Sequence, residues 1–137
     1  MRKFIIATHR TLAKGLADSL NFFSNKGNEI ETINAYVDDN NFPAEKVDSL
    51  FKTFTKEDEI VIMTDILSGS VTQKMSAYMN DRVFLITGIN LPLALALILL
   101  PTTTTLTNKK IEQLIEESKQ QIVLVNDNQT VDNSEDE

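Results

Sequence analysis

Residues 4–23, FIIATHRTLAKGLADSLNFF, combine a strand-length apolar run, a lone histidine and the start of a helical pattern. The run at residues 4–8 is typical of a buried strand. After it, apolar side chains recur at the three- and four-residue spacing of one helix face: Leu12, Leu16, Leu20, Phe23. His9, the only histidine of the chain, stands at the carboxyl end of this predicted strand, where α/β sheets bind ligands. The amino terminus of the following helix favours negative charge, so the position suits chemistry on a phosphoryl group.

The same alternation of strand and helix patterns continues along the chain. Further apolar runs predict strands at residues 60–63, 83–86 and 122–125. Residues 29–37 alternate weakly between apolar and polar side chains and predict an edge strand. Helical patterns lie between them, at residues 47–54, 70–79, 92–100 and 111–118. This order predicts a doubly wound α/β fold, with a mostly parallel five-stranded sheet of order 2-1-3-4-5 and helices on both faces. Residues 1–125 suit one compact domain.

The composition excludes several kinds of site. There is no cysteine and only one histidine, which excludes thiol catalysis, disulfides, thiolate metal sites and any site built from several histidines of this chain. We expect no metal and no cofactor. The longest apolar stretch, Leu91–Leu100, is about half as long as a membrane-crossing helix and is interpreted as a buried helix or part of a subunit interface. The amino terminus leads into a strand rather than a secretory signal, so we expect a cytoplasmic protein.

The net charge of −7 is unevenly distributed. Residues 126–137 carry five acidic and no basic side chains, which leaves 15 acidic and 13 basic residues in residues 1–125. This pattern predicts an acidic, flexible tail on a nearly neutral body. A nearly neutral body has no electrostatic footprint for nucleic acid, so we expect no nucleic-acid partner.

The predicted topology brings two distant residues to one crevice. In a sheet of order 2-1-3-4-5, the loops after strands one and three diverge, and here these strands end at His9 and Asp65. A carboxylate beside an imidazole accepts the hydrogen bond of one ring N–H and leaves the other ring nitrogen for a substrate. The order of elements therefore predicts a nucleophilic histidine oriented by an aspartate. The alternatives are a histidine that caps or packs a loop and an aspartate that caps a helix.

Two loops at the same edge offer groups that bind phosphate. Ser68, Gly69 and Ser70 follow the third strand and supply hydroxyls and backbone N–H groups. Asn90 follows the fourth strand and supplies a side-chain amide. Each short motif alone is weak, and their convergence on one edge is the informative feature.

Taken together, these pieces resemble the mannose-type IIA phosphocarrier domains of the bacterial phosphoenolpyruvate:sugar phosphotransferase system (PTS). The matching segments are residues 5–9, 62–65, 68–70 and 88–92, and the resemblance extends over residues 3–125. It implies that His9 accepts a phosphoryl group from the histidine phosphocarrier protein HPr and passes it to a IIB component. It also implies that Asp65 orients His9, and that Ser70 and nearby amides hold the phosphate.

The resemblance further implies how the protein assembles. The family forms homodimers in which the last strand crosses to the other subunit, so residues 122–125 are expected to be an exchanged, antiparallel strand. A terminal strand of four apolar residues needs a partner to bury it, which independently favours a dimer. Contact with the membrane is expected only indirectly, through the IIC/IID permease.

Two departures from the family pattern concern the phosphate site. Arg10 stands where the family usually has glycine, and a non-glycine residue is costly there if the position needs a positive φ. Alternatively, the Arg10 guanidinium helps to hold phosphate. The family's Gly-Gly-Ser-Pro after the third strand is replaced by residues 68–71, SGSV, so this loop has fewer glycines for a close approach to phosphate.

The resemblance favours in-line phosphoryl transfer between histidines of two docked proteins. No nucleotide-binding loop of the GxxxxGKS/T type is present, so direct use of ATP is not expected. Two alternatives keep the same fold: a phosphoryl-donor subunit for dihydroxyacetone kinase, and a regulatory binding module that transfers nothing. A response-regulator receiver would need paired acidic residues after the first strand, where this chain has Thr8 and His9.

Overall fold

The computed structural model describes residues 1–38 and 40–127. Within these residues one sheet contains the strands β1 (Arg2–His9), β2 (Ile30–Ala35), β3 (Glu59–Thr64) and β4 (Val83–Ile86). The α-helices are α1 (Leu12–Ser24), α2 (Ala44–Phe51), α3 (Ser70–Met75), α4 (Leu91–Leu99) and α5 (Asn108–Lys119). Short 3₁₀ turns are η1 (Gly27–Glu29), η2 (Ser76–Tyr78) and η3 (Val125–Asp127).

The strand order is β2-β1-β3-β4, and all three pairings in the sheet are parallel. The α/β fold class and the predicted order of the first four strands are therefore confirmed. In the register, His9 of β1 pairs with Ala35 of β2, and Ala7 of β1 pairs with Thr64 of β3. The carboxyl ends of these three strands consequently lie at one edge of the sheet, and Asp65 follows directly after β3.

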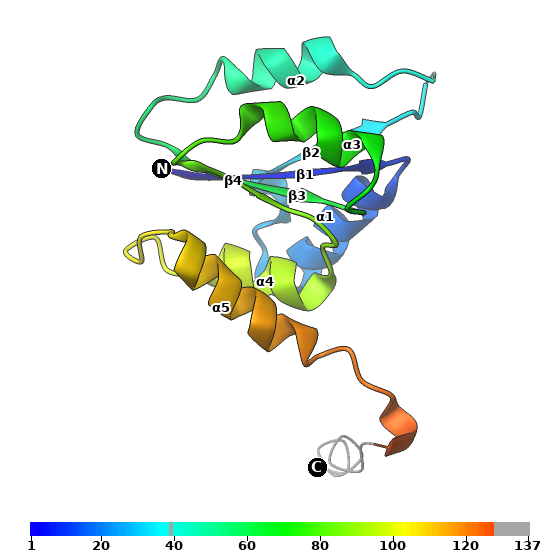
Figure 1. The fold of residues 1–137 in the computed structure, drawn as a ribbon, viewed down its shortest axis with the longest axis vertical. Coiled ribbons are helices and arrows are strands. Elements are labelled where there is room, and N and C mark those ends of the chain that lie inside the picture. Colours follow the sequence, from blue (N-terminus) through cyan, green and yellow to red (C-terminus); the bar gives the residue numbers. More distant parts are fainter. Residues whose placement is uncertain (39, 128–137) are drawn as a thin grey trace.

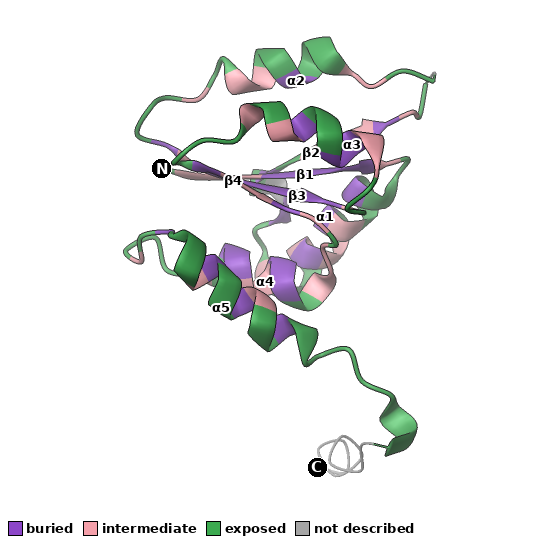
Figure 2. Cartoon of the chain, viewed as in Figure 1, coloured by how far each residue is buried: buried purple, intermediate pink, exposed green. Residues whose placement is uncertain are grey.

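Helices cover both faces of the sheet, as Figure 1 shows. Helices α2 and α3 lie on one face, and α1, α4 and α5 lie on the other. Alternation along β1 divides its side chains between two cores: Ile5 and Ala7 pack with α2 and α3, whereas Ile6 packs with the other three helices. All three are fully buried, and Figure 2 shows the strands as mainly buried residues between the helical layers. Burial on both faces explains the continuous apolar runs in the sequence.

The predicted fifth strand is wrong for this chain. Residues 122–124 follow α5 without regular secondary structure, and Val125 begins η3. The four side chains are largely exposed: Ile122 76%, Val123 46%, Leu124 66%, Val125 51%. The apolar sequence predicted burial, but a strand forms only where a neighbouring strand supplies hydrogen bonds, and within the described residues this segment pairs with no strand. Most of the expected acidic tail, residues 128–137, lies outside the described residues.

Two of the other differences from the predicted boundaries have local reasons. The strand expected at residues 29–37 ends at Ala35, because Tyr36 adopts a left-handed backbone with a φ of 62°. The helix expected at residues 70–79 tightens into η2 after Met75. The first of these differences matters for function, since it moves Tyr36 from the sheet to the edge where His9 lies.

The apolar stretch Leu91–Leu100 forms α4, and the prediction of a buried helix is confirmed. Leu93, Ala94, Leu97 and Ile98 are buried in the core beneath the sheet. Among the described residues, no helix combines the length and the apolar character that a membrane span requires.

Candidate active site

His9 and Asp65 meet at the carboxyl edge of the sheet. The Asp65 Oδ2 atom accepts the backbone N–H of His9 at 2.8 Å and lies 2.9 Å from the ring Nδ1 of the same residue. The other oxygen, Oδ1, accepts the backbone N–H of Ile66 at 3.1 Å. The aspartate therefore binds the histidine and the start of its own loop, and it does not cap α3, whose cap residue is Gly69.

The surroundings of Asp65 keep its carboxyl group ionised. Burial raises the pKa of Asp65, but the hydrogen bonds from the His9 backbone N–H and the His9 ring together hold that pKa below its usual range. An ionised carboxylate can only accept hydrogen bonds, so the Nδ1 atom of His9 must carry the ring proton. The lone pair of the neutral imidazole is then on Nε2. The His9 side chain is 34% exposed and that of Asp65 only 11%, so the ring is accessible while the carboxylate is shielded.

Gly69 lies against the imidazole. A Cβ atom built on Gly69 would lie 2.8 Å from the Cε1 atom of His9 and equally close to the Ile66 side chain. No side chain fits there unless the ring or the loop moves. The one glycine retained in this loop is therefore the one that allows its backbone to approach the histidine.

The departure at Arg10 has a structural consequence. Its φ is 57°, so the position does require the left-handed backbone that glycine adopts freely, at a cost of roughly 1 kcal/mol for arginine. Two hydrogen bonds offset this cost: the Arg10 N–H donates to Ala35 O at 2.8 Å, and its Nη1 donates to Tyr36 O at 2.7 Å. The guanidinium is exposed and held beside the edge where His9 lies.

Of the other residues expected to bind phosphate, Ser70 is linked to the His9 ring through Tyr36 in the described chain, whereas Ser68 and Asn90 are not. The Ser70 hydroxyl lies 2.6 Å from the hydroxyl of Tyr36, whose ring contacts the His9 ring with a centroid distance of 5.5 Å. Ser68 is exposed in the same loop. Asn90 uses its Oδ1 atom to accept the Leu93 N–H at 2.9 Å and so caps α4. Within residues 1–38 and 40–127, neither Ser68 nor Asn90 forms a hydrogen bond with His9.

The amino terminus of α1 is already partly occupied. The hydroxyl of Thr8 accepts the Ala13 N–H at 2.8 Å, and the side-chain oxygen of Asn34 accepts the Lys14 N–H at 3.2 Å. These two backbone donors are therefore not available to an anion. In the described part of the chain, no group of three or more acidic, histidine or cysteine side chains is placed to hold a metal ion.

Comparisons with known proteins agree with this geometry. A sequence model of the EIIA-man family, described as the PTS system fructose IIA component, matches residues 3–117. The chain belongs to this family. A similar solved structure, described as a phosphoenolpyruvate-dependent sugar PTS permease from Klebsiella pneumoniae, is 30% identical with a TM-score of 0.82, and the match covers 95% of this chain and 93% of that one. A search of curated proteins found no match.

Two more distant structures share the fold of this IIA chain. The PTS component EIIA from Streptococcus agalactiae is 23% identical with a TM-score of 0.71, over 92% of this chain and 98% of that one. A PTS IIA protein associated with the fucose utilization operon of Streptococcus pneumoniae is 20% identical with a TM-score of 0.67, over 91% and 93%. Family membership gives the IIA chain a role in phosphotransfer of a sugar PTS.

Sequence reasoning missed several residues at the site of this IIA chain. The sequence pattern places Tyr36 in the strand expected at residues 29–37, and no sequence signal marks its left-handed backbone. Three threonines form a hydroxyl cluster behind Asp65: Thr72 donates to Ile66 O at 2.7 Å, while Thr64 and Thr87 lie 2.7 and 3.2 Å from its Oγ1. The sequence did contain a signal for this cluster: Thr64 is the last residue of β3, and Thr87 directly follows β4, so both lie at the carboxyl edge of the sheet. The cluster fixes the loop that carries Asp65.

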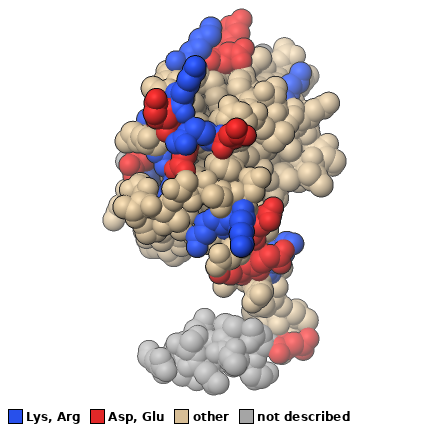
Figure 3. Space-filling model, turned by 60° about the vertical axis from the view of Figure 1, so that its left-hand side comes forward, with Lys and Arg blue, Asp and Glu red and all other residues tan. Residues whose placement is uncertain are grey.

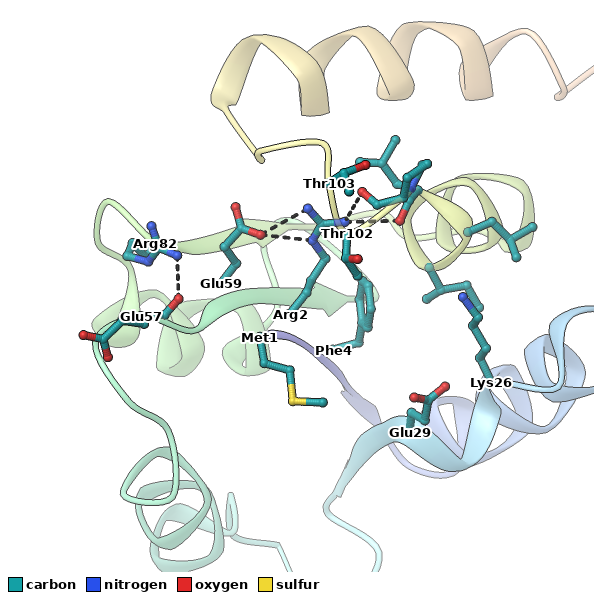
Figure 4. Close-up of a pocket in the computed structure, with 14 residues that line it drawn as sticks. Met1, Arg2, Phe4, Lys26, Glu29, Glu57, Glu59, Arg82, Thr102 and Thr103 are labelled. Carbon is teal, nitrogen blue, oxygen red and sulfur yellow. Dashed lines mark hydrogen bonds and ion pairs between the residues drawn. The ribbon is translucent and has the colours of Figure 1, made fainter.

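A cavity of about 720 Å³ lies at the opposite edge of the sheet from His9 (Figure 4). Within the described residues, the polar groups that line it stabilise the fold and do not contact the candidate active site. Arg2 crosses the cavity with a side chain only 3% exposed and pairs with Glu59 at 3.1 Å. Its remaining donors bond to the carbonyls of Leu100, Pro101 and Thr104. No donor of Arg2 is left for a ligand, and Figure 3 shows acidic and basic side chains interspersed on this side of the molecule.

We expect Arg2→Met to lower the free energy of unfolding by about 3–5 kcal/mol, since it leaves the mostly buried Glu59 carboxylate without its cation. Urea denaturation measures this loss. The double variant Arg2→Met, Glu59→Met should regain part of it, because both charges are then absent. A single variant as stable as the wild type would contradict the assignment of Arg2 as a structural clamp.

Proposed function

We propose that this chain is a phosphoryl carrier of a sugar PTS, which accepts a phosphoryl group from phospho-HPr on Nε2 of His9 and passes it to a IIB component during sugar uptake. One observation carries the proposal: Asp65 binds the Nδ1 side of the imidazole and leaves Nε2 as the nucleophilic atom. Membership of the IIA family supports it, because IIA domains of the PTS generally interact with HPr and IIB.

In the proposed reaction, the Nε2 lone pair of His9 attacks the phosphorus atom held on the HPr histidine. A new N–P bond forms, and the old N–P bond breaks with its electron pair returning to the HPr ring. The phosphorylated His9 still carries its Nδ1 proton and therefore has a positively charged ring. The Asp65 carboxylate, 2.9 Å away, stabilises that charge as it develops.

We assign the phosphate contacts to the groups that surround the ring. Gly69 offers close backbone approach, Ser70 a hydroxyl, and Arg10 an exposed guanidinium. Ser68 and Asn90 are weaker candidates, since Ser68 points to solvent from the loop and Asn90 caps α4. No metal and no cofactor enter the proposed reaction.

Exposed apolar side chains lie on the elements that follow the strands at the sheet edge of His9, and they support a protein as the phosphoryl donor. They lie on the loops and the helix that follow β1, β2 and β3: Leu12 52%, Val37 39%, Ile66 54%, Leu67 78% exposed. A docked protein would bury them and exclude water from the transfer. We propose residues 1–125 as one phosphocarrier domain that acts in the cytoplasm and reaches the membrane only through the IIC/IID permease.

The proposed function is tested by incubating the protein with phosphoenolpyruvate, enzyme I and HPr. The chain should acquire phosphate that is labile in acid and stable in alkali, and a IIB component should discharge it. Dihydroxyacetone kinase as the acceptor in the same assay separates the donor-subunit alternative. An unlabelled chain in the presence of phospho-HPr would refute the proposal and favour a regulatory module.

We also propose that the chain forms a homodimer through residues 122–125. In a single chain these apolar residues are exposed, and β4 is an edge strand that pairs only with β3 in the sheet. A groove of about 520 Å³ runs between β4 and α5 and is lined by Phe84, Ile111 and Ile115. A second copy can therefore offer the segment both an open strand edge and an apolar surface.

A chain that ends at Gln121 should sediment as a monomer, because it lacks the exchanged segment. The matched control ends at Asp127, which keeps the segment and removes only residues 128–137, and it should remain a dimer. Sedimentation velocity distinguishes the two. Equal sedimentation of both truncated chains would count against exchange of residues 122–125.

A further inference from the structure

Tyr36 is held in an unusual conformation beside the histidine. Its φ of 62° is left-handed, which costs a bulky aromatic residue energy that glycine would not lose. The neighbouring Arg10 has the same backbone conformation, and the Arg10 guanidinium donates to the carbonyl of Tyr36 at 2.7 Å. Strained residues persist where the surroundings fix them, and they concentrate at functional sites.

The conformation gives Tyr36 contacts with two residues of the candidate site at once. Its ring lies against the His9 ring at a centroid distance of 5.5 Å and an interplanar angle of 32°. Its hydroxyl lies 2.6 Å from the Ser70 hydroxyl. With an extended backbone, β2 would continue through Tyr36 and carry this side chain along the strand instead of turning it at the sheet edge.

The hydrogen bond between the two hydroxyls has a preferred direction when phosphate is bound. A phenol is the stronger acid of the pair, so its O–H is the better donor and Ser70 Oγ the better acceptor. The Ser70 proton is then free to point toward an anionic phosphoryl oxygen. A chain of this kind, phenol to serine to phosphoryl oxygen, is cooperative, because each bond polarises the next.

We propose that Tyr36 is a positioning residue for phosphoryl transfer: its hydroxyl orients the Ser70 hydroxyl toward the phosphoryl group on His9, and its ring fixes the plane of the imidazole. The inference rests on the proposed phosphocarrier function and deepens it. Tyr36 and Ser70 form no covalent bond and exchange no proton with the phosphoryl group. Their contribution is the orientation of one donor, which is worth about tenfold in rate.

The test compares Tyr36→Phe, Ser70→Ala and the double variant in steady-state transfer from phospho-HPr to a IIB component. Tyr36→Phe keeps the ring and removes the hydroxyl, so we expect kcat to fall about tenfold with KM for HPr unchanged. Because the two residues act as one chain, the double variant should be no slower than Ser70→Ala alone. The matched control is Tyr78→Phe, which removes the hydroxyl of the other tyrosine, bonded to Asp48, and should leave kcat unchanged.

The outcomes separate this inference from the function on which it rests. Wild-type kcat in Tyr36→Phe, with slow transfer in Ser70→Ala, would overturn the role of the Tyr36 hydroxyl in orienting Ser70 and leave the carrier function standing. Additive losses in the double variant would also overturn it, since Tyr36 would then act independently of Ser70. A wild-type chain that accepts no phosphate would refute the carrier function and this role together. Thermal unfolding midpoints, expected to differ little between Tyr36→Phe and wild type, exclude a loss of folded protein.

Discussion

Replacing His9 by alanine should reduce phosphorylation by phospho-HPr by at least about 10⁴-fold, because the variant lacks the nucleophile. His9 is the only histidine of the chain, so no neighbouring imidazole can replace it. The measurement is the amount of acid-labile, alkali-stable phosphate per chain. The protein must be prepared without a polyhistidine tag, since a tag would add competing imidazoles.

The fold of the His9→Ala variant should survive the substitution. The backbone N–H of residue 9 still donates to the Asp65 carboxylate at 2.8 Å, and the side chain that is lost is one-third exposed rather than part of the core. Circular dichroism and the unfolding midpoint provide the control. Undiminished labelling of a folded variant would place the phosphate on another residue and refute the assignment of His9.

The parts of the fold that the sequence predicted are those in which local pattern and tertiary packing agree. Strands β1, β3 and β4 are apolar because both faces of the sheet are covered. Helix α1 forms as expected, but its buried residues are Ala13, Ala17 and Leu20, whereas Leu12 and Phe23 of the predicted stripe are 52% and 58% exposed. The meeting of His9 and Asp65 followed from topology alone, since parallel strands of this order end side by side. These inferences needed no knowledge of side-chain conformation.

The structural features that the sequence did not predict all depend on interactions that a local sequence pattern does not encode. Residues 122–125 have the composition of a strand, yet pairing is a property of a partner rather than of the segment. The cap that Asn90 forms through its oxygen with the Leu93 N–H of α4 was likewise not visible in the pattern, and the assignment of its side-chain NH2 group to phosphate stays a prediction. Tyr36 fits the alternation of an edge strand, and its left-handed backbone is held by contacts with Arg10 that lie 26 residues away in sequence.

Asp65→Asn should slow transfer by about 10²–10⁴-fold, a loss of the size that follows when an orienting aspartate becomes an amide. The hydrogen bonds of Asp65 show why the isosteric amide does not fit. Oδ2 accepts two donors from His9, and Oδ1 accepts the N–H of Ile66. An asparagine amide group in place of Oδ1 would face the Ile66 N–H donor. In place of Oδ2 it would face the His9 backbone N–H and donate to Nδ1, which moves the ring proton to Nε2 and blocks the nucleophile.

The pH dependence of stability provides a second measurement on the same variant. Because the pKa of Asp65 is lowered in the folded state, its ionised form stabilises the fold above the ordinary carboxyl pKa of about 4. This contribution is lost as the pH falls through the lowered pKa. The difference in unfolding free energy between wild type and Asp65→Asn should therefore be largest near neutral pH and shrink in acid below about pH 4.

The matched control is Asp58→Asn, at the other edge of the sheet. Asp58 also has a lowered pKa, because its carboxylate accepts the Thr55 N–H and pairs with the terminal amine at 3.2 Å. Removal of the Asp58 carboxylate should likewise lower the unfolding free energy most near neutral pH and less in acid. It should leave the single-turnover rate of phosphoryl transfer unchanged. If Asp65→Asn transferred phosphate at the wild-type rate, the carboxylate would have no part in directing Nε2 of His9 toward phosphorus. The nucleophile would then have to be selected by other groups beside the ring, such as Gly69 and Tyr36.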